Sequence, residues 1–571
     1  MTGIDYENNL ENNNNDDIIV IQRGGCDMKK IAVGIEDFKK IIDENYYFID
    51  KSLFIKDIIN ETVAFYTRPR RFGKTLNMSM LYYFFSCKEI DNAYLFKGLS
   101  IFNDKDALKY QNQYPVIFIS FKDMKKDTFK EQINQYRVIL LNILRQYKEL
   151  QDSSSLLNID KFMIYQYLNK EGSINDLTNS LLNLTIYLYE HYQKKVILLI
   201  DEYDVPLQSA YLNGYYEEMS HFLSGLFSSV LKTNDALEKG ILTGCLRIAK
   251  ESIFTGLNNF NVYSLQEEQS SLNFGFSTQE VEELLEYYHC SDYFQDIKEW
   301  YDGYKFGNQE IYNPWSVLKY VHKILHSSDK TPECYWANTS GNDIVYRYIK
   351  QSDYTMKDDF DLLISDHSII KIIKNELTYR EMDDIHNIYS FLLFTGYLKM
   401  IRRIDMNTYE LSIPNKEIKY IYIHIFQEWF KDIMNNKKSM FLDALFHKDE
   451  IKARKILNDL LFQSVSYFDE KEDFYHGFLL GMLQGTSIKS NQESGYGRFD
   501  IAIIPSDFDS IGIIIECKKA KSLEEIKKKS EEAARQIRDK KYIEGFYSQG
   551  YTNFIGYGIA FYKKSCYITK L

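Results

Sequence analysis

The fold follows from the stretch Val63-Ala64-Phe65-Tyr66-Thr67-Arg68-Pro69-Arg70-Arg71-Phe72-Gly73-Lys74-Thr75, in which a strand-like apolar run leads into a glycine-lysine loop. Residues 76–85 then show helical spacing. Such a loop binds phosphate when backbone N–H groups converge at a helix N-terminus, Lys74 meets the β and γ phosphates, and the Thr75 hydroxyl binds magnesium. Arg68 occupies the place of the usual first glycine, so this Walker A-like motif departs from the common form. The loop residues expected at the nucleotide are Arg71, Phe72, Gly73, Lys74 and Thr75.

A second strand-like run, Val196 to Ile200, ends in Asp201-Glu202. In this Walker B-like position we expect Asp201 to hold magnesium and Glu202 to polarise the attacking water. Thr243, at the end of a further apolar run, is expected to sense the γ-phosphate, although a capping role is an equal alternative. The pattern predicts ATP and Mg²⁺ as cofactors, with Thr75 and Asp201 on the metal. Two other interpretations stay open: a solvated turn with a polar strand end, or a site that binds nucleotide and hydrolyses it poorly.

The chain as a whole has the pattern of several domains. Two more apolar runs, Val116 to Ile119 and Gly240 to Thr243, complete a buried parallel sheet with crossover helices, so the fold class is α/β. A hairpin-like piece, Tyr397 to Ile413, stands between helical patterns and suggests a winged helix. The expected divisions are a disordered polar tail (1–27), a P-loop domain (28–265), a helical lid or winged-helix-like region (266–465) and a C-terminal α/β unit (466–571).

The C-terminal unit contains a second group of chemically active residues. Phe499-Asp500-Ile501-Ala502 is followed by Ile514-Ile515-Glu516-Cys517-Lys518, and strand alternation puts Glu516 and Lys518 on one face. Metal-dependent phosphodiester hydrolysis needs two carboxylates on one cation and a lysine beside the nucleophile. An ordinary surface hairpin with a Glu/Lys pair is the alternative. The expected catalytic residues are Asp500, Glu516 and Lys518, and the expected metal ligands are Asp500, Glu516 and Glu493.

A charged helix is expected after these strands, from Leu523 to Tyr542, with Gln536 and Tyr542 near the carboxylates. Its excess of Lys and Arg would contact phosphates, or form a solvated face. His476, on a preceding helix, is more typical of a packing or capping residue, and we leave it out of the site.

Composition narrows the class of protein. The 571 residues are 45% hydrophobic, which indicates several folded domains, and the net charge of -12 does not exclude a local basic surface for nucleic acid. The seven cysteines are scattered without zinc-like spacing, as in reduced cytoplasmic proteins. The longest apolar runs are strand-sized, well short of the roughly 18 residues of a membrane span. We therefore expect a cytoplasmic protein with no membrane partner.

Longer blocks of sequence extend these motifs. Tyr66 to Leu81, Ile200 to Leu207, Tyr312-Asn313-Pro314-Trp315 and Glu493 to Asp500 together resemble the AAA-ATPase-like family that carries a PD-(D/E)XK nuclease-like C-terminal domain. The resemblance covers nearly everything from about residue 30 onward, and the Arg-Pro-Arg-Arg-Phe form of the loop resembles the family's own. It implies an additional-strand P-loop fold, ATP binding and nuclease homology.

The leading hypothesis is an ATP-regulated, magnesium-dependent nuclease or DNA-processing ATPase. Its expected partner is nucleic acid, in the first place DNA, together with a protein partner or further copies of the chain. The alternative is a nucleotide-dependent switch whose nuclease-like domain binds nucleic acid or protein without cutting it.

Overall fold

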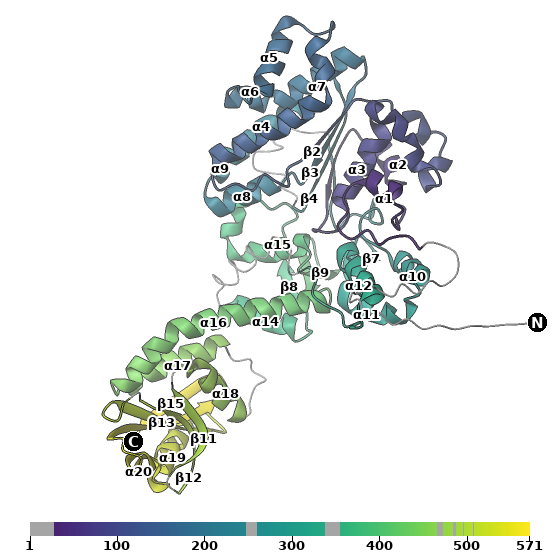
Figure 1. Ribbon diagram of the computed structural model, residues 1–571. Helices are drawn as coiled ribbons and strands as arrows, with labels where there is room; N and C mark the ends of the chain where they lie inside the picture. Colours follow the sequence, from purple (N-terminus) through teal and green to yellow (C-terminus); the bar gives the residue numbers. More distant parts are fainter. Residues whose placement is uncertain are drawn as a thin grey trace, which may run out of the picture.

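The computed structural model describes residues 28–246, 260–336, 354–464, 472–483, 487–494, 496–505 and 507–571. The expected tail, residues 1–27, lies outside this part of the chain. Figure 1 shows three regions in chain order: an N-terminal α/β domain, a middle region below its sheet, and a C-terminal α/β domain at the end of a long helix.

The N-terminal domain is built on a parallel sheet with the order β2-β3-β4-β1-β5. Every residue of β1 and β3 is buried, as is usual for strands covered by helices on both faces. β4 separates the strand before the phosphate loop from the acid-ended strand, which is the additional-strand arrangement. The four strands predicted from apolar runs are confirmed, and the short β5 was not predicted. The strands are β1 (Val63–Thr67), β2 (Val116–Ser120), β3 (Val196–Asp201), β4 (Leu237–Gly244) and β5 (Asn261–Tyr263).

Helices cover both faces of this sheet, with α1 to α3 on one side and α4 to α9 on the other (Figure 1). The first group comprises α1 (Phe38–Asp43), α2 (Phe54–Ile59) and α3 (Lys74–Phe85), with the 3-10 helices η1 (Cys87–Phe96), η2 (Ser100–Asn103) and η3 (Ala107–Tyr110). The second comprises α4 (Phe129–Gln146), η4 (Lys148–Asp152), α5 (Asn158–Leu168), α6 (Ile174–Thr178), α7 (Ser180–Tyr192), α8 (Val205–Asn213) and α9 (Tyr216–Leu231).

The middle region has two parts. The first consists of α10 (Thr278–Tyr287), η5 (Ser291–Tyr293), α11 (Phe294–Tyr301), the hairpin β6 (Tyr304–Phe306) with β7 (Gln309–Ile311), and α12 (Pro314–His326). The second consists of α14 (Tyr354–Ile364), β8 (Ile369–Ile372), η6 (Arg380–Asp383), η7 (Ile385–Asn387), α15 (Ile388–Thr395), β9 (Lys399–Arg403) and β10 (Thr408–Ser412). Its strands form an antiparallel sheet, β8-β10-β9. This succession of helices followed by a hairpin is that of a winged helix, as the sequence suggested.

The C-terminal domain is a mixed sheet with the order β11-β12-β13-β14-β15, in which only the β13–β14 pair is parallel among the described strands. One face packs on α16 to α18 and the other on α19 and α20. The elements are α16 (Lys416–Phe446), α17 (Glu450–Ser464), α18 (Glu472–Leu483), β11 (Ile488–Ser494), β12 (Gly497–Ile503), β13 (Ile511–Lys519), α19 (Ile526–Asp539), α20 (Tyr542–Tyr547), β14 (Asn553–Tyr562) and β15 (Ser565–Lys570).

One helix prediction in this domain was wrong. We expected a single helix from Leu523 to Tyr542, but α19 ends at Asp539 and α20 begins at Tyr542. Lys541 between them has φ +54°, a left-handed conformation that interrupts an α-helix. The last two strands, β14 and β15, were not predicted.

The long helix α16 is anchored in the middle region by a buried carboxylate, Glu417. Its carboxylate oxygens accept hydrogen bonds from the Ser316 hydroxyl (2.9 and 3.1 Å) and from the backbone N–H groups of Tyr335 (2.7 Å) and Trp336 (2.9 Å). Ser316 belongs to the first turn of α12, so Glu417 fixes the start of α16 to the start of α12. Burial raises the pKa of Glu417 to about 7.

The raised pKa predicts a specific pH dependence of stability. Because the folded pKa lies above the usual carboxyl value, Glu417 favours folding fully below about pH 4.5, and this contribution is lost as the pH rises through 7. Glu417→Gln keeps an acceptor oxygen without a charge. Relative to wild type it should therefore gain stability between pH 5 and pH 8, by at most on the order of 3 kcal/mol. Thermal melts at both pH values measure the difference.

The matched control is Glu299→Gln, which removes a partly exposed carboxylate that pairs with Lys416 beside Glu417. The melting temperature of Glu299→Gln should not exceed that of wild type at pH 8. A Glu417→Gln minus wild-type difference that stays constant from pH 5 to pH 8 would contradict the assignment.

Candidate functional site

The loop between β1 and α3 has the backbone shape of a phosphate-binding loop. Gly73 caps α3 with φ +82°, and Arg71 is also left-handed with φ +68°. Lys74 is buried, and its ammonium donates to the carbonyl oxygens of Arg68 (3.0 Å) and Pro69 (2.9 Å). The lysine is therefore held over the loop at the N-terminus of α3, where the free backbone N–H groups of a helix attract anions.

Three of the predicted residues meet at the ends of β3, β4 and α3. The Asp201 carboxylate accepts hydrogen bonds from the hydroxyls of Thr75 (2.7 Å) and Thr243 (2.6 Å). Asp201 is fully buried, and burial raises the pKa of its carboxyl. A hydroxyl and a carboxylate side by side are oxygen ligands of the kind that Mg²⁺ takes, so these residues fit the expected metal.

Glu202 follows directly and has an unusual backbone. Its φ is +55°, a left-handed conformation that costs a non-glycine residue free energy and that clusters at functional sites. Burial raises the pKa of its carboxyl, and the neighbouring Asp201 adds to the effect. Glu202 lines the cavity beside the loop, which is where a group that accepts a proton from water is needed.

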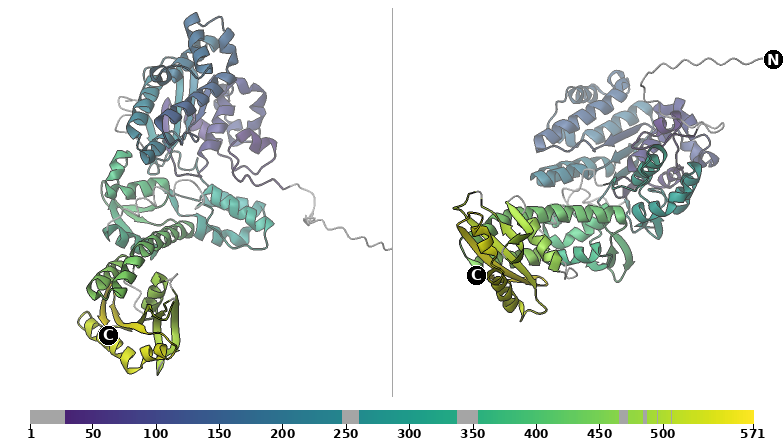
Figure 2. Two further views of the ribbon diagram at one scale, coloured as in Figure 1. Left: turned by 60° about the vertical axis from the view of Figure 1, so that its left-hand side comes forward. Right: turned by 60° about the horizontal axis from the view of Figure 1, so that its bottom comes forward.

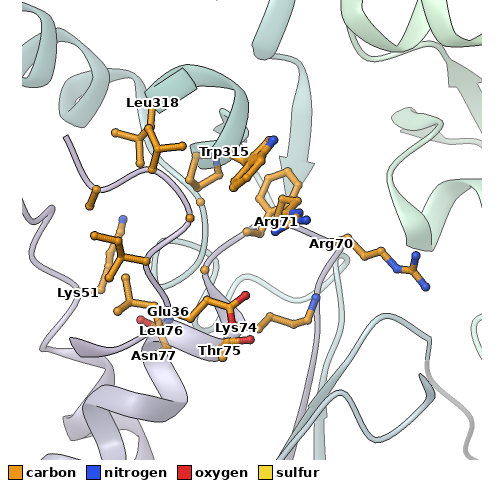
Figure 3. A pocket seen from close by; sticks show the side chains of 18 of the residues that line it. Glu36, Lys51, Arg70, Arg71, Lys74, Thr75, Leu76, Asn77, Trp315 and Leu318 are labelled. Atoms are coloured by element: carbon orange, nitrogen blue, oxygen red, sulfur yellow. The ribbon is translucent and has the colours of Figure 1, made fainter. Parts of the chain in front are cut away.

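A cavity of about 360 Å³ extends from this loop (Figure 3). Lys74, Thr75 and Glu202 are among the polar residues that line it, and a group of apolar residues lines it as well. The apolar wall combines an N-terminal segment with α12 of the middle region and includes Ile35, Ile41, Ile49, Trp315 and Leu318. A cavity of this size and character suits a small molecule with a charged and a flat apolar part.

The arginine in place of the first glycine is part of the framework. Arg68 is fully buried, and its Nη1 donates to the carbonyl oxygens of Thr67 (2.8 Å), Tyr263 (2.7 Å) and Ser264 (2.9 Å). Burial lowers the pKa of the guanidinium to about 10. Arg68 therefore holds the segment after β5 against the start of the phosphate loop.

The other loop residues make separate contacts with the middle region. The guanidinium of Arg71 lies 4.3 Å from the ring centre of Trp315, as Figure 3 shows, while Arg70 points away from the cavity. Phe72 forms part of the cavity wall, but its ring is fully buried against Tyr304 with centroids 4.9 Å apart. Of the five loop residues expected at the nucleotide, Phe72 thus has mainly a packing role.

Sequence reasoning did not assign Glu36, Lys122 or Trp315 to this site, although all three line the cavity. Trp315 stands in one of the blocks that carried the family resemblance, so a signal existed. Glu36 and Lys122 stand in no recognisable motif.

The structure brings Asp500, Glu516 and Lys518 together in the C-terminal domain. β12 and β13 are antiparallel, and the last pair in their register is Ile501 opposite Ile515. Asp500 precedes Ile501 and Glu516 follows Ile515, so both lie just beyond this last pair. Asp500 accepts a hydrogen bond from the Cys517 N–H at 2.7 Å, and Lys518 Nζ lies 3.9 Å from Glu516 Oε1. Asp500 and Glu516 thus lie at neighbouring positions of adjacent strands with Lys518 beside Glu516, and these are the residue types that a metal-dependent phosphodiesterase needs.

A surrounding set of hydrogen bonds orients these groups. Gln536 donates to Glu516, and its amide lies 3.4 Å from the Tyr542 hydroxyl, which donates to the Arg498 carbonyl at 2.8 Å. Burial raises the pKa of Tyr542, and the nearby carboxylates add to it. His476 donates to the Asp500 carbonyl at 3.2 Å, a positioning contact. Glu493 lies on β11, but its side chain is outside the described part of the chain.

Within the described ranges, no group of three or more His, Cys, Asp or Glu side chains is arranged to hold a metal ion. The metal sites expected at Thr75 and Asp201 and at Asp500 and Glu516 therefore stay predictions. None of the helices the structure describes has the length and apolar composition to span a membrane.

Together these features define a class: an additional-strand P-loop domain, a winged-helix-like middle region, and a mixed-sheet domain with paired carboxylates. Residues 32–254 match the family described as Predicted AAA-ATPase, and residues 470–571 match the PD-(D/E)XK nuclease superfamily. The chain thus carries a predicted AAA-ATPase domain and a C-terminal PD-(D/E)XK nuclease superfamily domain. The resemblance seen in the sequence is confirmed for both regions.

Individual relatives are more distant. A protein of Azotobacter chroococcum mcd 1, named "Uncharacterized protein in vnfD 5'region", is 28% identical over 300 residues. That match covers 52% of this chain and 52% of the relative, so the chain spans about half the length of the curated relative it matches. Among solved structures, a signal transduction ATPase with numerous domains (STAND) and a tetratricopeptide repeat sensor, from Pyrococcus horikoshii, is 12% identical. It covers 73% of this chain and 53% of its own, with a TM-score of 0.19, too low to establish a common fold.

The role of Arg68 gives a prediction that runs against the motif. Arg68→Gly would restore the usual loop glycine, yet it would remove the side-chain donor of four carbonyl groups, those of Thr67, Tyr263, Ser264 and Ser270. We expect it to lower the free energy of unfolding by on the order of 3 kcal/mol and to bring no gain in nucleotide affinity. Chemical denaturation followed by fluorescence measures the loss.

Arg71→Ala is the control, because this exposed side chain stacks on Trp315 and its removal should cost less than about 1 kcal/mol. An Arg68→Gly variant as stable as wild type would show that the buried guanidinium does not hold the loop.

Proposed function

We propose that this chain binds ATP at the phosphate loop and uses the nucleotide state to regulate a magnesium-dependent nuclease that acts on DNA. The observation that supports it most is the presence of both sites in one chain, linked by a middle region that lines the nucleotide cavity through Trp315 and extends through α16 into the last domain. The proposal includes domains at 28–265, 266–465 and 466–571, assembly with a protein partner or further copies, and a cytoplasmic location.

At the nucleotide site, the residues of this chain have separate tasks. Lys74 exchanges the carbonyl oxygens of Arg68 and Pro69 for the β and γ phosphates. Thr75 and Asp201 are the residues that would hold Mg²⁺, which offsets the charge of the phosphates when bound. Glu202 accepts the proton of the attacking water, and its raised pKa suits that task. Thr243 orients Asp201 through its hydroxyl, so any sensing of the γ-phosphate passes through that carboxylate.

At the nuclease-like site, Asp500 and Glu516 are the carboxylates that would hold Mg²⁺, which supplies activation of water and charge neutralisation when bound. Lys518 is placed to orient the nucleophile and to balance charge on the phosphate. The Asp500 carboxylate is held by the Cys517 N–H and Glu516 by Gln536, so both acceptors are fixed before a substrate arrives.

The nucleotide site is tested by Lys74→Ala. Loss of the only loop lysine should weaken ATP binding at least about tenfold, since a charge-assisted contact to phosphate is worth about 1.5 to 3 kcal/mol. Titration of the full chain with a fluorescent ATP analogue measures the affinity. Lys232→Ala, an exposed lysine after α9, is the control and should bind as wild type does. Equal binding by Lys74→Ala would refute the site.

The nuclease site is tested by Asp500→Asn and Lys518→Ala. Asn keeps an oxygen for the Cys517 N–H, so the fold should survive while the charge is lost. Each change should slow magnesium-dependent cleavage of labelled DNA about a hundredfold or more. Lys521→Ala, exposed and just beyond β13, is the control.

The same assay separates the functions. Cleavage by wild type that is unaffected by ATP and by Lys74→Ala would remove the regulation and leave the nuclease. ATP binding without metal-dependent cleavage of single- or double-stranded DNA or RNA would select the nucleotide switch instead.

A further inference from the structure

Lys122 lies at the edge of the parallel sheet where hydrolysis of a nucleotide would take place. β2 pairs with β3 so that Ser120 stands beside Asp201, and the Phe121 N–H donates to the Asp201 carbonyl at 2.9 Å. The chain therefore leaves β2 next to the acid-ended strand. Lys122 lines the same cavity as Glu202.

The partner of Lys122 is a carboxylate that a phosphate can replace. Its ammonium lies 3.1 Å from Glu36 Oε2, and the two side chains are 49% and 45% exposed. An ion pair this exposed contributes little to stability, so separating its two side chains costs little free energy. Glu36 lines the same cavity as Lys74 and Thr75 (Figure 3). Glu36 also raises the pKa of Lys122, which keeps the amine charged.

Four other cations that line the cavity have different geometry, and a fifth, Lys125, lies three residues after Lys122 in the same loop. Lys51 is held by Glu280 at 2.6 Å on the side of the middle region. Arg71 lies on Trp315, and Arg70 points away toward Gln208. Lys74 approaches the phosphates from the loop. Lys122 instead approaches from the sheet edge that carries Glu202, the side from which water would attack.

We propose that Lys122 is a catalytic residue of the nucleotide site, which moves from Glu36 to the γ-phosphate of a bound nucleoside triphosphate. The proposal rests on the nucleotide function proposed above. In the reaction, a water oxygen bonds to the γ-phosphorus and the bond to the β–γ bridging oxygen breaks. The electron pair stays on ADP, and the water proton passes to Glu202. Charge is spread over the γ-phosphoryl oxygens in the transition state, where a positioned cation lowers the barrier.

The contact is tested by comparing AMP-PNP with ADP, because only the former carries a γ-phosphate. The full chain is titrated with each nucleotide in the presence of magnesium. Lys122→Ala should lose affinity for AMP-PNP about tenfold and keep its affinity for ADP within about twofold. Glu36→Gln, which frees Lys122, should bind AMP-PNP a few times more tightly and leave ADP unchanged. Lys130→Ala, an exposed lysine of α4, is the control and should alter neither.

Phosphate release from ATP is the second measurement. Lys122→Ala should lower kcat about 10² to 10³-fold, and Lys122→Arg should restore part of it. If Lys122→Ala leaves the ratio of AMP-PNP affinity to ADP affinity unchanged, the proposal is overturned. The nucleotide site itself would stand in that case, provided that wild type binds both ligands. Wild type that binds neither nucleotide would overturn the nucleotide function and this inference together.

Discussion

The buried guanidinium of Arg68 holds the phosphate loop and the middle region together. Burying a charged group is costly unless it is hydrogen-bonded, and here backbone carbonyls of Tyr263, Ser264 and Ser270 accept from the two terminal nitrogens of Arg68. Its Nε is buried without a partner among the described residues. Phe274 and Phe306 lie against the guanidinium, each with its ring centre 5.2 Å away. The loop can therefore take its shape only when the chain that follows the sheet has folded against it. A glycine in this place would remove these hydrogen bonds between the two parts.

The rest of the loop continues this connection residue by residue. Pro69 packs on Gly396 at the end of α15, where a Cβ would come within 3.1 Å of the proline, and Arg71 stacks on Trp315 of α12. The residue after Trp315 is Ser316, which hydrogen-bonds Glu417 at the start of α16. Each of these contacts joins a residue of the phosphate loop, or the residue next to its partner, directly to the middle region. A ligand at the loop therefore touches side chains that lie one residue from the anchor of the helix leading to the nuclease-like domain.

The sequence predicted those parts of the molecule in which local pattern and tertiary structure agree. Buried parallel strands need continuous apolar runs, so β1 to β4 were found and with them the acid at the end of β3. Alternation of side chains along a strand likewise placed Glu516 and Lys518 on one face, because local sequence spacing alone determines it. β5 has only three residues and no such run, while the burial of Arg68 contradicts the usual exposure of arginine. Glu36, Lys122 and Trp315 reach the cavity through tertiary packing of distant segments, which no local spacing records.

The middle region limits how nucleotide and nuclease sites can influence each other. Figure 2 places the C-terminal domain at the far end of α16 from the P-loop sheet in both views. A second contact, Lys564 Nζ to Asp358 Oδ1 at 3.7 Å, joins that domain to α14. A shift of α12 must either carry α16 with it or break the hydrogen bonds of Glu417 and leave a buried carboxylate unsatisfied, which is costly. Movement of α12 and α16 together as one rigid body therefore costs less free energy than movement of α12 alone. The size of any coupling is then bounded by the difference in nucleotide affinity between the two positions of α12, because a ligand shifts an equilibrium only by its preference for one state.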